Sequence, residues 1–294
     1  MTTRPRRARS SSGKTRAKTL RRASPLQRFA QFTAMAVAAV ALASCAVLPT
    51  IRYPQKSDAK PHEGVASAQS YAIHGIDVSK WQGTIDWTSV RNAGTQFAVI
   101  KATEGGDHLD ERFYENWNGA GAAGVPRGAY HFVYWCRPAH EQAEWFKRHI
   151  PADPDALPPV LDVEWNNASR TCPQRVPRDV AIEKIRTMLR ELEAHTGKRP
   201  IIYTDINFHK DILIGEFNDY PYWLRSVAAE PEARYDNRRW TFWQYTTTGR
   251  VPGIRGDVDR NVFYGTENQW KIFRTTDCDP RDLRQLQQIG LCGK

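Results

Sequence analysis

Short apolar runs alternate with helix-like segments along the chain from residue 71 onward. The runs are rich in β-branched and aromatic residues and have Gly or Pro nearby, which is typical of strands. The segments between them carry helix boundary signals, such as a Pro at the start or a Gly at the end. Five strand–helix units are expected, with strands at 73–81, 96–104, 127–135, 158–165 and 199–205 and helices at 85–94, 110–124, 138–150, 177–197 and 207–217.

The segment 177–197 has the clearest helical pattern in the chain. Its apolar residues recur every three or four positions, and Gly197 follows them as an expected C-cap. The face that they predict consists of Val180, Ile182, Ile185, Met188, Leu189 and Leu192. We expect this face to pack against the sheet.

The pattern changes after residue 217. Three further strands are expected at 220–228, 238–247 and 256–263, with no room for helices between them. Repeated strand–helix units require parallel strands and right-handed crossovers. The chain therefore predicts an α/β fold of the TIM-barrel type, written (β/α)₅β₃, with one catalytic domain. An open doubly wound sheet is the alternative, but it would usually carry a Gly-rich phosphate loop after its first strand, and GIDVSKWQG is not one.

Net charge separates a basic head from a neutral body. The 294-residue chain has a formal net charge of +10, and its first 28 residues hold eight Arg, two Lys and no acid. The remainder is balanced, so it carries no sequence-wide attraction for nucleic acid. The basic head is therefore interpreted as a targeting element.

The segment that follows the basic head has the features of an export signal. An apolar stretch at 32–43 is as long as a signal-peptide core and short for a membrane span. It ends in LASC, which resembles the bacterial lipobox, and Cys45 would then be acylated. An uncleaved anchor over 29–48, ordinary cleavage and twin-arginine export through Arg21 and Arg22 remain alternatives. Residues 46–70 are expected to form a tether.

Four further cysteines favour disulfide bonds. Cys136, Cys172, Cys278 and Cys292 form an even set, and an exported protein would oxidise them. Three pairings are possible, and pairing of near neighbours gives Cys136–Cys172 and Cys278–Cys292. The second pair would staple a C-terminal extension, residues 271–294, that holds a short helix near 279–290. Without CxxC or HxH spacing, no metal site is predicted.

Acidic residues follow several of the predicted strands. They are Asp77, Glu104, Asp162, Glu164 and Asp259. In such a barrel the active site lies at the carboxyl ends of the strands. Asp162 and Glu164 share one face of their strand, roughly 6–7 Å apart at Cα. Two carboxyls so close in an apolar setting cannot both ionise freely, so one should keep a proton and act as a general acid, as a glycosidase requires.

Aromatic residues accompany these acids. About half of them are expected to be ordinary core, and rings at strand ends beside acids also suit stacking on sugars. The set consists of Trp81, Tyr130, Tyr134, Trp135, Trp165, Tyr203, Trp223, Trp243 and Tyr245.

A series of segments resembles family 25 of the glycoside hydrolases in order and spacing. The segments are GIDVSKWQGTIDW, VIKATEG, RGAYHF, PVLDVEW, PIIYTD, YWLRS and FWQYTTTGRVPGIRGDVDRNVF, and they cover roughly residues 71–270. The resemblance implies a (β/α)₅β₃ barrel and a lysozyme that cuts the β-1,4 bond between N-acetylmuramic acid and N-acetylglucosamine in peptidoglycan. It implies no cofactor.

The resemblance also implies roles for individual residues. Glu164 would be the proton donor, Asp162 would steady the N-acetyl group or the developing cation, and Asp77 and Asp259 would be outer carboxylates that position the substrate. Substrate contacts would come from Tyr130, Glu104, Tyr203, Trp243, Gln244 and Tyr245. One departure is WLRSVAAEP, where many relatives have a small residue and an aromatic after the Trp. A second is the presence of Cys136 and Cys172 in loops beside the cleft.

The leading interpretation is a monomeric muramidase tethered to a membrane of the bacterial envelope, either in the periplasm or on the outer surface. Its partners would be peptidoglycan glycan strands and, through the N-terminal lipid or anchor, the membrane, but not nucleic acid. The domain boundaries would be 1–45 for the signal, 46–70 for the tether and 71–270 for the barrel. The rivals are a non-catalytic peptidoglycan-binding lipoprotein on the same barrel and a glycosidase for another amino-sugar polymer, such as chitin.

Overall fold

The computed structural model describes residues 66–276 and 279–282. Its strands are β1 (Ile73–Val78), β2 (Phe97–Glu104), β3 (His108–Leu109), β4 (Arg127–Phe132), β5 (Val160–Val163), β6 (Ile201–Thr204), β7 (Tyr222–Arg225), β8 (Phe242–Gly249) and β9 (Val258–Phe263). Its α-helices are α2 (Trp87–Asn92), α3 (Phe113–Ala122), α4 (Ala139–His149), α5 (Arg178–Thr196), α6 (Ile206–Phe208) and α7 (Glu267–Thr276). Short helical turns are η1 (Ala66–Ser70), η2 (Lys80–Gln82), η3 (His209–Leu213) and η4 (Pro231–Ala233).

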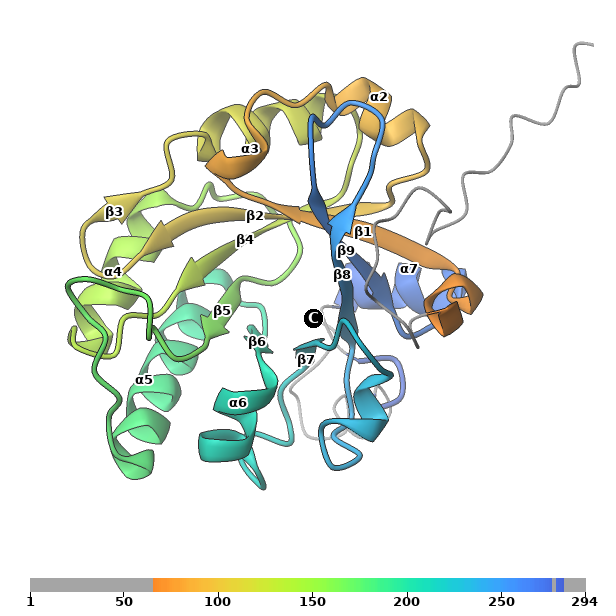
Figure 1. Ribbon diagram of the computed structural model, residues 1–294. Coiled ribbons are helices and arrows are strands. Elements are labelled where there is room, and N and C mark those ends of the chain that lie inside the picture. Colours follow the sequence, from red (N-terminus) through yellow and green to blue (C-terminus); the bar gives the residue numbers. More distant parts are fainter. Residues whose placement is uncertain (1–65, 277–278, 283–294) are drawn as a thin grey trace, which may run out of the picture. The chain divides into compact units, whose positions relative to one another are not determined.

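Eight of the strands close into a barrel. The strand order is β1-β9-β8-β7-β6-β5-β4-β2, and β1 pairs with β2 to complete the ring, while the two-residue β3 adds to the outer edge of β2. Helices α3, α4 and α5 lie outside the strands (Figure 1). The predicted (β/α)₅β₃ barrel is therefore confirmed, and the alternative of an open sheet is wrong.

The last strand runs against the others. Strands β1, β2, β4, β5, β6, β7 and β8 are parallel where they pair, whereas β9 is antiparallel to both β8 and β1. Its first residues therefore lie at the end of the barrel where the parallel strands finish. Asp259 lies beside Asp77 of β1 for this reason, and not because it ends a parallel strand, as the sequence had suggested.

Four of the five predicted helices are present with shorter bounds. In α5 the apolar face is buried from Ala181 to Leu192, and Gly197 caps the helix in the left-handed conformation with φ +69°. Val180 is the exception, since its side chain is exposed. The segment expected as one helix at 207–217 is instead the single turn α6 followed by the π-helical turn η3.

Alternation along the strands fills the lower part of the barrel interior with apolar side chains. The cluster comprises Ile73, Phe97, Val99, Leu157, Val160, Ile201, Tyr203, Trp223, Phe242, Phe263, Trp270 and Phe273. Phe97 of β2 reaches Phe242 of β8 across the interior, with ring centroids 5.3 Å apart. Gly75 leaves room for that ring, because a Cβ at Gly75 would lie 2.5 Å from it. The rows between these positions face outward and form the larger cluster with the helices.

Helix α7 closes the lower end of the barrel. Its buried Trp270 contacts the rings of Phe97, Phe242 and Phe263, with centroids 5.4, 6.3 and 5.2 Å away. This helix was not expected from the sequence, which placed a short helix near 279–290 instead. Most of that predicted segment lies outside the described residues.

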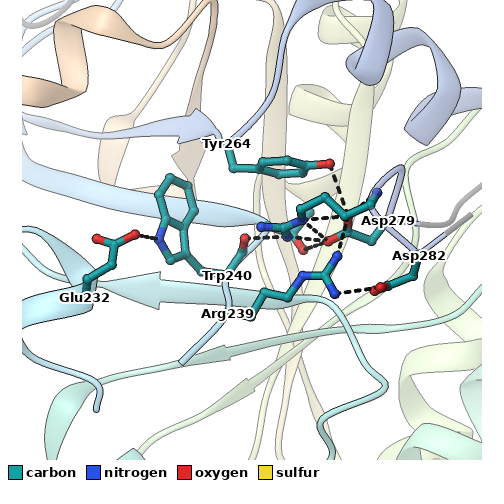
Figure 2. Close-up of polar contacts among 8 residues, drawn as sticks. Glu232, Arg239, Trp240, Tyr264, Asp279 and Asp282 are labelled. Carbon is teal, nitrogen blue, oxygen red and sulfur yellow. Dashed lines mark hydrogen bonds and ion pairs between the residues drawn. The ribbon is translucent and has the colours of Figure 1, made fainter. Parts of the chain in front are cut away.

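Residues 279–282 pack against the same end of the barrel. Asp279 accepts hydrogen bonds from the Tyr264 hydroxyl at 3.1 Å and the Thr241 hydroxyl at 3.3 Å (Figure 2). Arg239 pairs with Asp279 and with Asp282, and Arg281 pairs with Asp279. Burial opposes ionisation of Asp279, but the arginine contacts outweigh it and hold its pKa below the ordinary value. This network fastens the described part of the C-terminal segment to the residues just before β8 and just after β9.

One of the two predicted disulfides is present. Cys136 and Cys172 are bonded, with their Cα atoms 5.6 Å apart, and they join the loops after β4 and β5. Cys45, Cys278 and Cys292 lie outside the described residues, as do the predicted signal and most of the tether. Within the described ranges, no helix is long and apolar enough to cross a membrane.

We predict that Trp270→Ala destabilises the protein by about 3–5 kcal/mol, because it empties the space beneath the apolar interior. Urea unfolding measures the change. Lys271→Ala is the matched control, since Lys271 is exposed on the same helix, and it should change the free energy of unfolding by less than about 0.5 kcal/mol. Equal stabilities of the two variants would contradict the role given to α7.

Candidate active site

Polar side chains form a layer above the apolar interior, at the end where the parallel strands finish. On the parallel strands each follows an inward-facing apolar or glycine position by two residues, and on the antiparallel β9 Asn261 and Asp259 precede Phe263 by two and four residues, so strand alternation turns all of them to the same side. The layer comprises Asp77, Lys101, Tyr130, Asp162, Tyr203, Arg225, Gln244, Asn261 and Asp259. Every strand of the ring contributes to this layer, which we call the mouth of the barrel.

Asp77 is held by amide donors. One of its carboxylate oxygens accepts hydrogen bonds from Gln244 Nε2 at 3.0 Å and from Asn261 Nδ2 at 2.7 Å. Both amides are themselves positioned, since the Tyr203 hydroxyl donates to Gln244 Oε1 at 2.9 Å and the Trp223 indole donates to Asn261 Oδ1 at 2.8 Å. Asp77 therefore sits at the centre of a fixed hydrogen-bond network.

Asp259 lies directly opposite Asp77 in the β1–β9 pair. Burial raises the pKa of Asp259 to about 9, and the neighbouring Asp77 carboxylate adds to the effect. At neutral pH, Asp259 therefore keeps its proton and shares it with Asp77. Two carboxyls that share a proton in a buried site behave in this way because both cannot ionise.

Asp162 is buried without a complete set of hydrogen bonds. Within the part of the chain that the structure describes, its Oδ1 has no hydrogen-bond partner. Burial raises its pKa well above the ordinary value, the charge of Glu164 raises it further, and Lys101 opposes both. A buried oxygen left unpaired is costly and is often found at functional sites.

Glu164 follows β5 directly and lies at the top of the mouth. Burial raises its pKa to about 7, with the charges of Asp205 and Asp77 adding, while Arg225 and the Tyr203 hydroxyl oppose the rise. Its backbone is fixed, since its carbonyl accepts a hydrogen bond from the Trp135 indole at 2.6 Å. A carboxyl with a pKa near neutrality can deliver a proton under physiological conditions.

Glu104 lies on the other side of Lys101. It forms an ion pair with Lys101 and accepts a hydrogen bond from the Tyr134 hydroxyl at 3.0 Å. Burial opposes ionisation of Glu104, but these two partners outweigh it and hold its pKa below the ordinary value. Glu104 is therefore a fixed anion that holds Lys101 near Asp162.

The aromatic predictions divide into two groups. Tyr130 and Tyr203 lie among the acids. Burial and then the charge of Asp77 raise the pKa of the Tyr130 hydroxyl well above its ordinary value, and burial and then the charge of Glu164 do the same for Tyr203. Trp243 and Tyr245 are not brought there. Both are fully buried in the outer cluster with the helices, because alternation turns only Gln244 of this segment inward.

The sequence did not identify several residues that lie in or next to the mouth. Lys101, Arg225, Asp205 and Asn261 all act on the acids, and none was selected as a site residue. Arg225 and Lys101 had a usable signal, since each lies two positions after an inward-facing apolar residue. Asp205 had none, because it lies in a short turn where it also caps α6 by accepting a hydrogen bond from the Phe208 amide.

A possible metal-ligating group lies away from the mouth, on α4 and α5. The ligand atoms of His140, Glu144 and Glu191 lie within 4.8 Å of one another. Lys147 pairs with both glutamates, so an ammonium group already balances their charge. We interpret this group as a surface ion-pair cluster.

The fold and the mouth together define an α/β-barrel hydrolase with paired carboxyls. Comparison with known proteins makes this class specific. The model of the family described as Glycosyl hydrolases family 25 matches residues 76–254. The chain belongs to this family and is a glycoside hydrolase.

Individual relatives agree with the family match. Lysozyme M1 of Streptomyces globisporus is 38% identical over 233 residues, which cover 73% of this chain and 76% of that protein. The uncharacterized protein YegX of Escherichia coli K12 is 41% identical over 211 residues, covering 69% and 74%. A family 25 glycosyl hydrolase from Bacillus anthracis superposes with a TM-score of 0.66 at 35% identity, covering 72% of this chain and 98% of that one.

We predict that Asp259→Asn makes the protein more stable at pH 8 than the wild type. The wild-type Asp259 stays protonated in the folded state up to a pKa of about 9 but ionises in the unfolded state above about 3.9. Wild-type stability should therefore fall as the pH rises between these values, by up to about 1.4 kcal/mol per pH unit. Asn cannot ionise, and its amide can still donate to Asp77.

Chemical unfolding at pH 5 and pH 8 measures this difference. The control is Asp155→Asn, which replaces an exposed carboxylate in the loop before β5. It should leave the pH dependence of the wild type unchanged. If Asp259→Asn also kept the wild-type dependence, Asp259 would not hold its proton as described.

Proposed function

We propose that the protein is a lysozyme that hydrolyses the β-1,4 bond between N-acetylmuramic acid and N-acetylglucosamine in bacterial peptidoglycan. The observation that carries the proposal is the pair Asp162 and Glu164 in the mouth, where burial raises both pKa values. The assigned substrate is supported by the family match and by the similarity of the chain to Lysozyme M1.

Glu164 is the proton donor in this mechanism. With a pKa of about 7, it is largely protonated below neutrality and donates to the glycosidic oxygen as the bond to the sugar breaks. The electron pair of that bond passes to the oxygen, and the sugar left behind carries positive charge. Transfer at this position leaves Glu164 ionised beside the cation.

Asp162 stabilises the sugar on which positive charge develops. Its unpartnered Oδ1 is available to the N-acetyl group or to the developing cation. Positive charge on the sugar favours the ionised form of Asp162, so the stabilisation grows as the bond breaks. Asp77 and Asp259 position the substrate from the opposite side, and Tyr130, Tyr203 and Gln244 complete the sugar contacts.

The spacing of the two carboxyls favours net retention. Asp162 and Glu164 are two positions apart, roughly 6–7 Å at Cα, and retaining glycosidases keep their carboxyls closer together than inverting ones do. Retention would follow from either a covalent adduct or attack by the acetamido group of the substrate. NMR of the first product determines its anomeric configuration and so distinguishes retention from inversion.

The proposal extends to location and organisation. The basic head, the apolar stretch at 32–43 and the LASC sequence support export to the bacterial envelope and attachment through Cys45 or an anchor. The barrel at 71–270 would work as a monomer, since one chain supplies every group in the mouth. A tether of residues 46–70 and an extension of residues 271–294 complete this organisation.

We predict that Glu164→Gln lowers turnover of purified peptidoglycan by about 10²–10⁴-fold, because Gln keeps the shape but has no proton to donate. Binding to insoluble peptidoglycan should persist. The control is Glu183→Gln, an exposed position on α5, which should keep wild-type turnover.

The same assay separates the rival functions. A wild-type protein that binds peptidoglycan without releasing muropeptides would be a binding protein, and one that cleaves chitin in preference would be a different glycosidase. Turnover near the wild-type rate in Glu164→Gln would show that another group donates the proton.

We predict that Arg225→Met moves the alkaline limb of the pH–rate profile to higher pH. Glu164 must be protonated to act, so activity should fall as the pH rises through its pKa of about 7. Asp205, Asp77, Arg225 and Tyr203 act on this carboxyl, and Arg225 is the cation that favours its charged form. Removing it should raise the pKa of Glu164.

The measurement is the pH dependence of kcat/KM. Arg234→Met is the control, since Arg234 is exposed and lies in the connection after β7, and it should leave the limb in place. A limb that stayed fixed or moved to lower pH in Arg225→Met would mean that Glu164 is not the titrating group.

A further inference from the structure

Trp81 is exposed to an unusual degree beside the mouth. Its side chain is 81% exposed, whereas the other large exposed apolar residues among those described are between 38% and 48% exposed. A single exposed apolar side chain is ordinary on a protein surface. Its position beside a groove is what makes Trp81 a candidate for binding.

The groove lies between two connections at the same end of the barrel. One wall consists of residues 81–84 and Asp86 from the connection after β1, and the other is residues 253–255 from the connection between β8 and β9. The groove has a volume of about 730 Å³. Its charged lining residues are Asp86 and Arg255, so the lining carries no net charge.

The groove is built on a fixed backbone. Ser79 and Gln82 form a reciprocal capping pair around the turn that carries Trp81. The Asp86 amide donates to the Gly253 carbonyl at 2.9 Å and joins the two walls. Gly253 is required at this contact, because a Cβ there would lie 2.4 Å from the Asp86 carbonyl oxygen.

The indole itself is partly pre-positioned. The Lys80 ammonium lies 5.5 Å from the centre of the Trp81 ring, and it is held from the other side by an ion pair with Glu111 at 3.0 Å. A ring carried on a rigid backbone loses little conformational freedom when it binds a ligand.

The chain connects both walls of the groove closely to the acids of the mouth. Trp81 follows Asp77 by four residues, which limits the distance between their Cα atoms to about 14 Å. The Gln82 amide also donates to the carbonyl of Asp257 at 3.4 Å, and Asp257 lies two residues before Asp259. The groove is therefore within reach of a polymer that is bound across the mouth.

We propose that Trp81 and this groove form an outlying saccharide subsite, which binds a sugar ring of the glycan strand beyond the two sugars at the cleaved bond. The proposal rests on the proposed lysozyme function. A flat exposed ring offers one face to the apolar face of a sugar, and the exposed Thr84 offers a hydroxyl to the polar groups of that sugar. The absence of net charge fits a neutral sugar ring.

The test compares substrates of different length. Glycan strands stripped of stem peptides are the long substrate, and the shortest fragment that the wild type cleaves is the short one. For Trp81→Ala, the ratio of KM for long strands to KM for the fragment should rise about 3- to 10-fold over the wild-type ratio. Trp81→Phe keeps an aromatic face and should restore most of the wild-type ratio.

A matched control removes another exposed apolar side chain. Ile214 is 48% exposed and lies outside the groove, so Ile214→Ala should keep the wild-type ratio. Because Trp81 is exposed, its variants should also unfold at the wild-type temperature, which separates an effect on binding from an effect on folding.

The outcomes distinguish this proposal from the proposed function. A wild-type ratio in Trp81→Ala, with Glu164→Gln inactive, would overturn the subsite and leave the lysozyme function standing. If the wild type cleaved neither substrate, the lysozyme function would fail, and co-sedimentation with stripped glycan strands would then decide on the subsite. Equal retention of wild type and Trp81→Ala in that assay would overturn it.

Discussion

The burial of carboxyl groups at one end of the barrel is the constraint on which the rest of the site depends. Asp77, Asp162, Asp259 and Glu164 share a space that is largely closed to water, and ionised carboxylates are costly there unless they are paired or hydrogen-bonded. Arg225 and Lys101 are the cations that act on them. The remaining charge has to be removed by protons, which is why the pKa values of these groups rise.

The fold makes this arrangement possible through strand alternation. Along each strand, one inward-facing residue joins the apolar lower layer and the next inward-facing residue joins the polar layer above it. Trp270 of α7 seals the lower layer from beneath, so the acids meet solvent only from the mouth. At the upper end, Trp135 holds the Glu164 carbonyl, and the adjacent Cys136 is bonded to Cys172. The group proposed to donate the proton is therefore carried on a rigid loop.

The sequence predicts the parts of this structure that depend on local pattern. The strand–helix repeats, the apolar face and glycine cap of α5, and the carboxyls near the strand ends all follow from short-range periodicity. The same periodicity, applied more strictly, would have turned Gln244 inward with Trp243 and Tyr245 outward, and it would have added Arg225 and Lys101 to the mouth. Residue type alone does not assign the face of a strand on which a side chain lies.

Other features depend on contacts between distant parts of the chain. The reversal of β9 cannot be read from its own residues, because direction is set by pairing with β8 and β1. Helix α7 has weak local signals, and its position follows from the aromatic interior that it covers. The pKa of Glu164 depends on Asp205 and Arg225, which reach it from the turn after β6 and from β7 rather than from its own strand. In each case the determining partner lies in another element of the fold.

The carboxyls on the two sides of the mouth differ in how many hydrogen bonds they accept. This difference indicates which side positions the substrate and which side takes part in the reaction. Asp77 receives two amide donors and shares the proton of Asp259, so its hydrogen bonds are already made and little is left for a reacting group. Asp162 has an unpartnered oxygen among the described residues, so it can form a new interaction when a substrate arrives. Asp77 and Asp259 are fixed and position the substrate, whereas Asp162 forms a new interaction during the reaction. This arrangement favours the transition state over the bound substrate. In the proposed mechanism, the free energy spent on leaving Asp162 unpaired in the empty site is recovered when positive charge develops beside it.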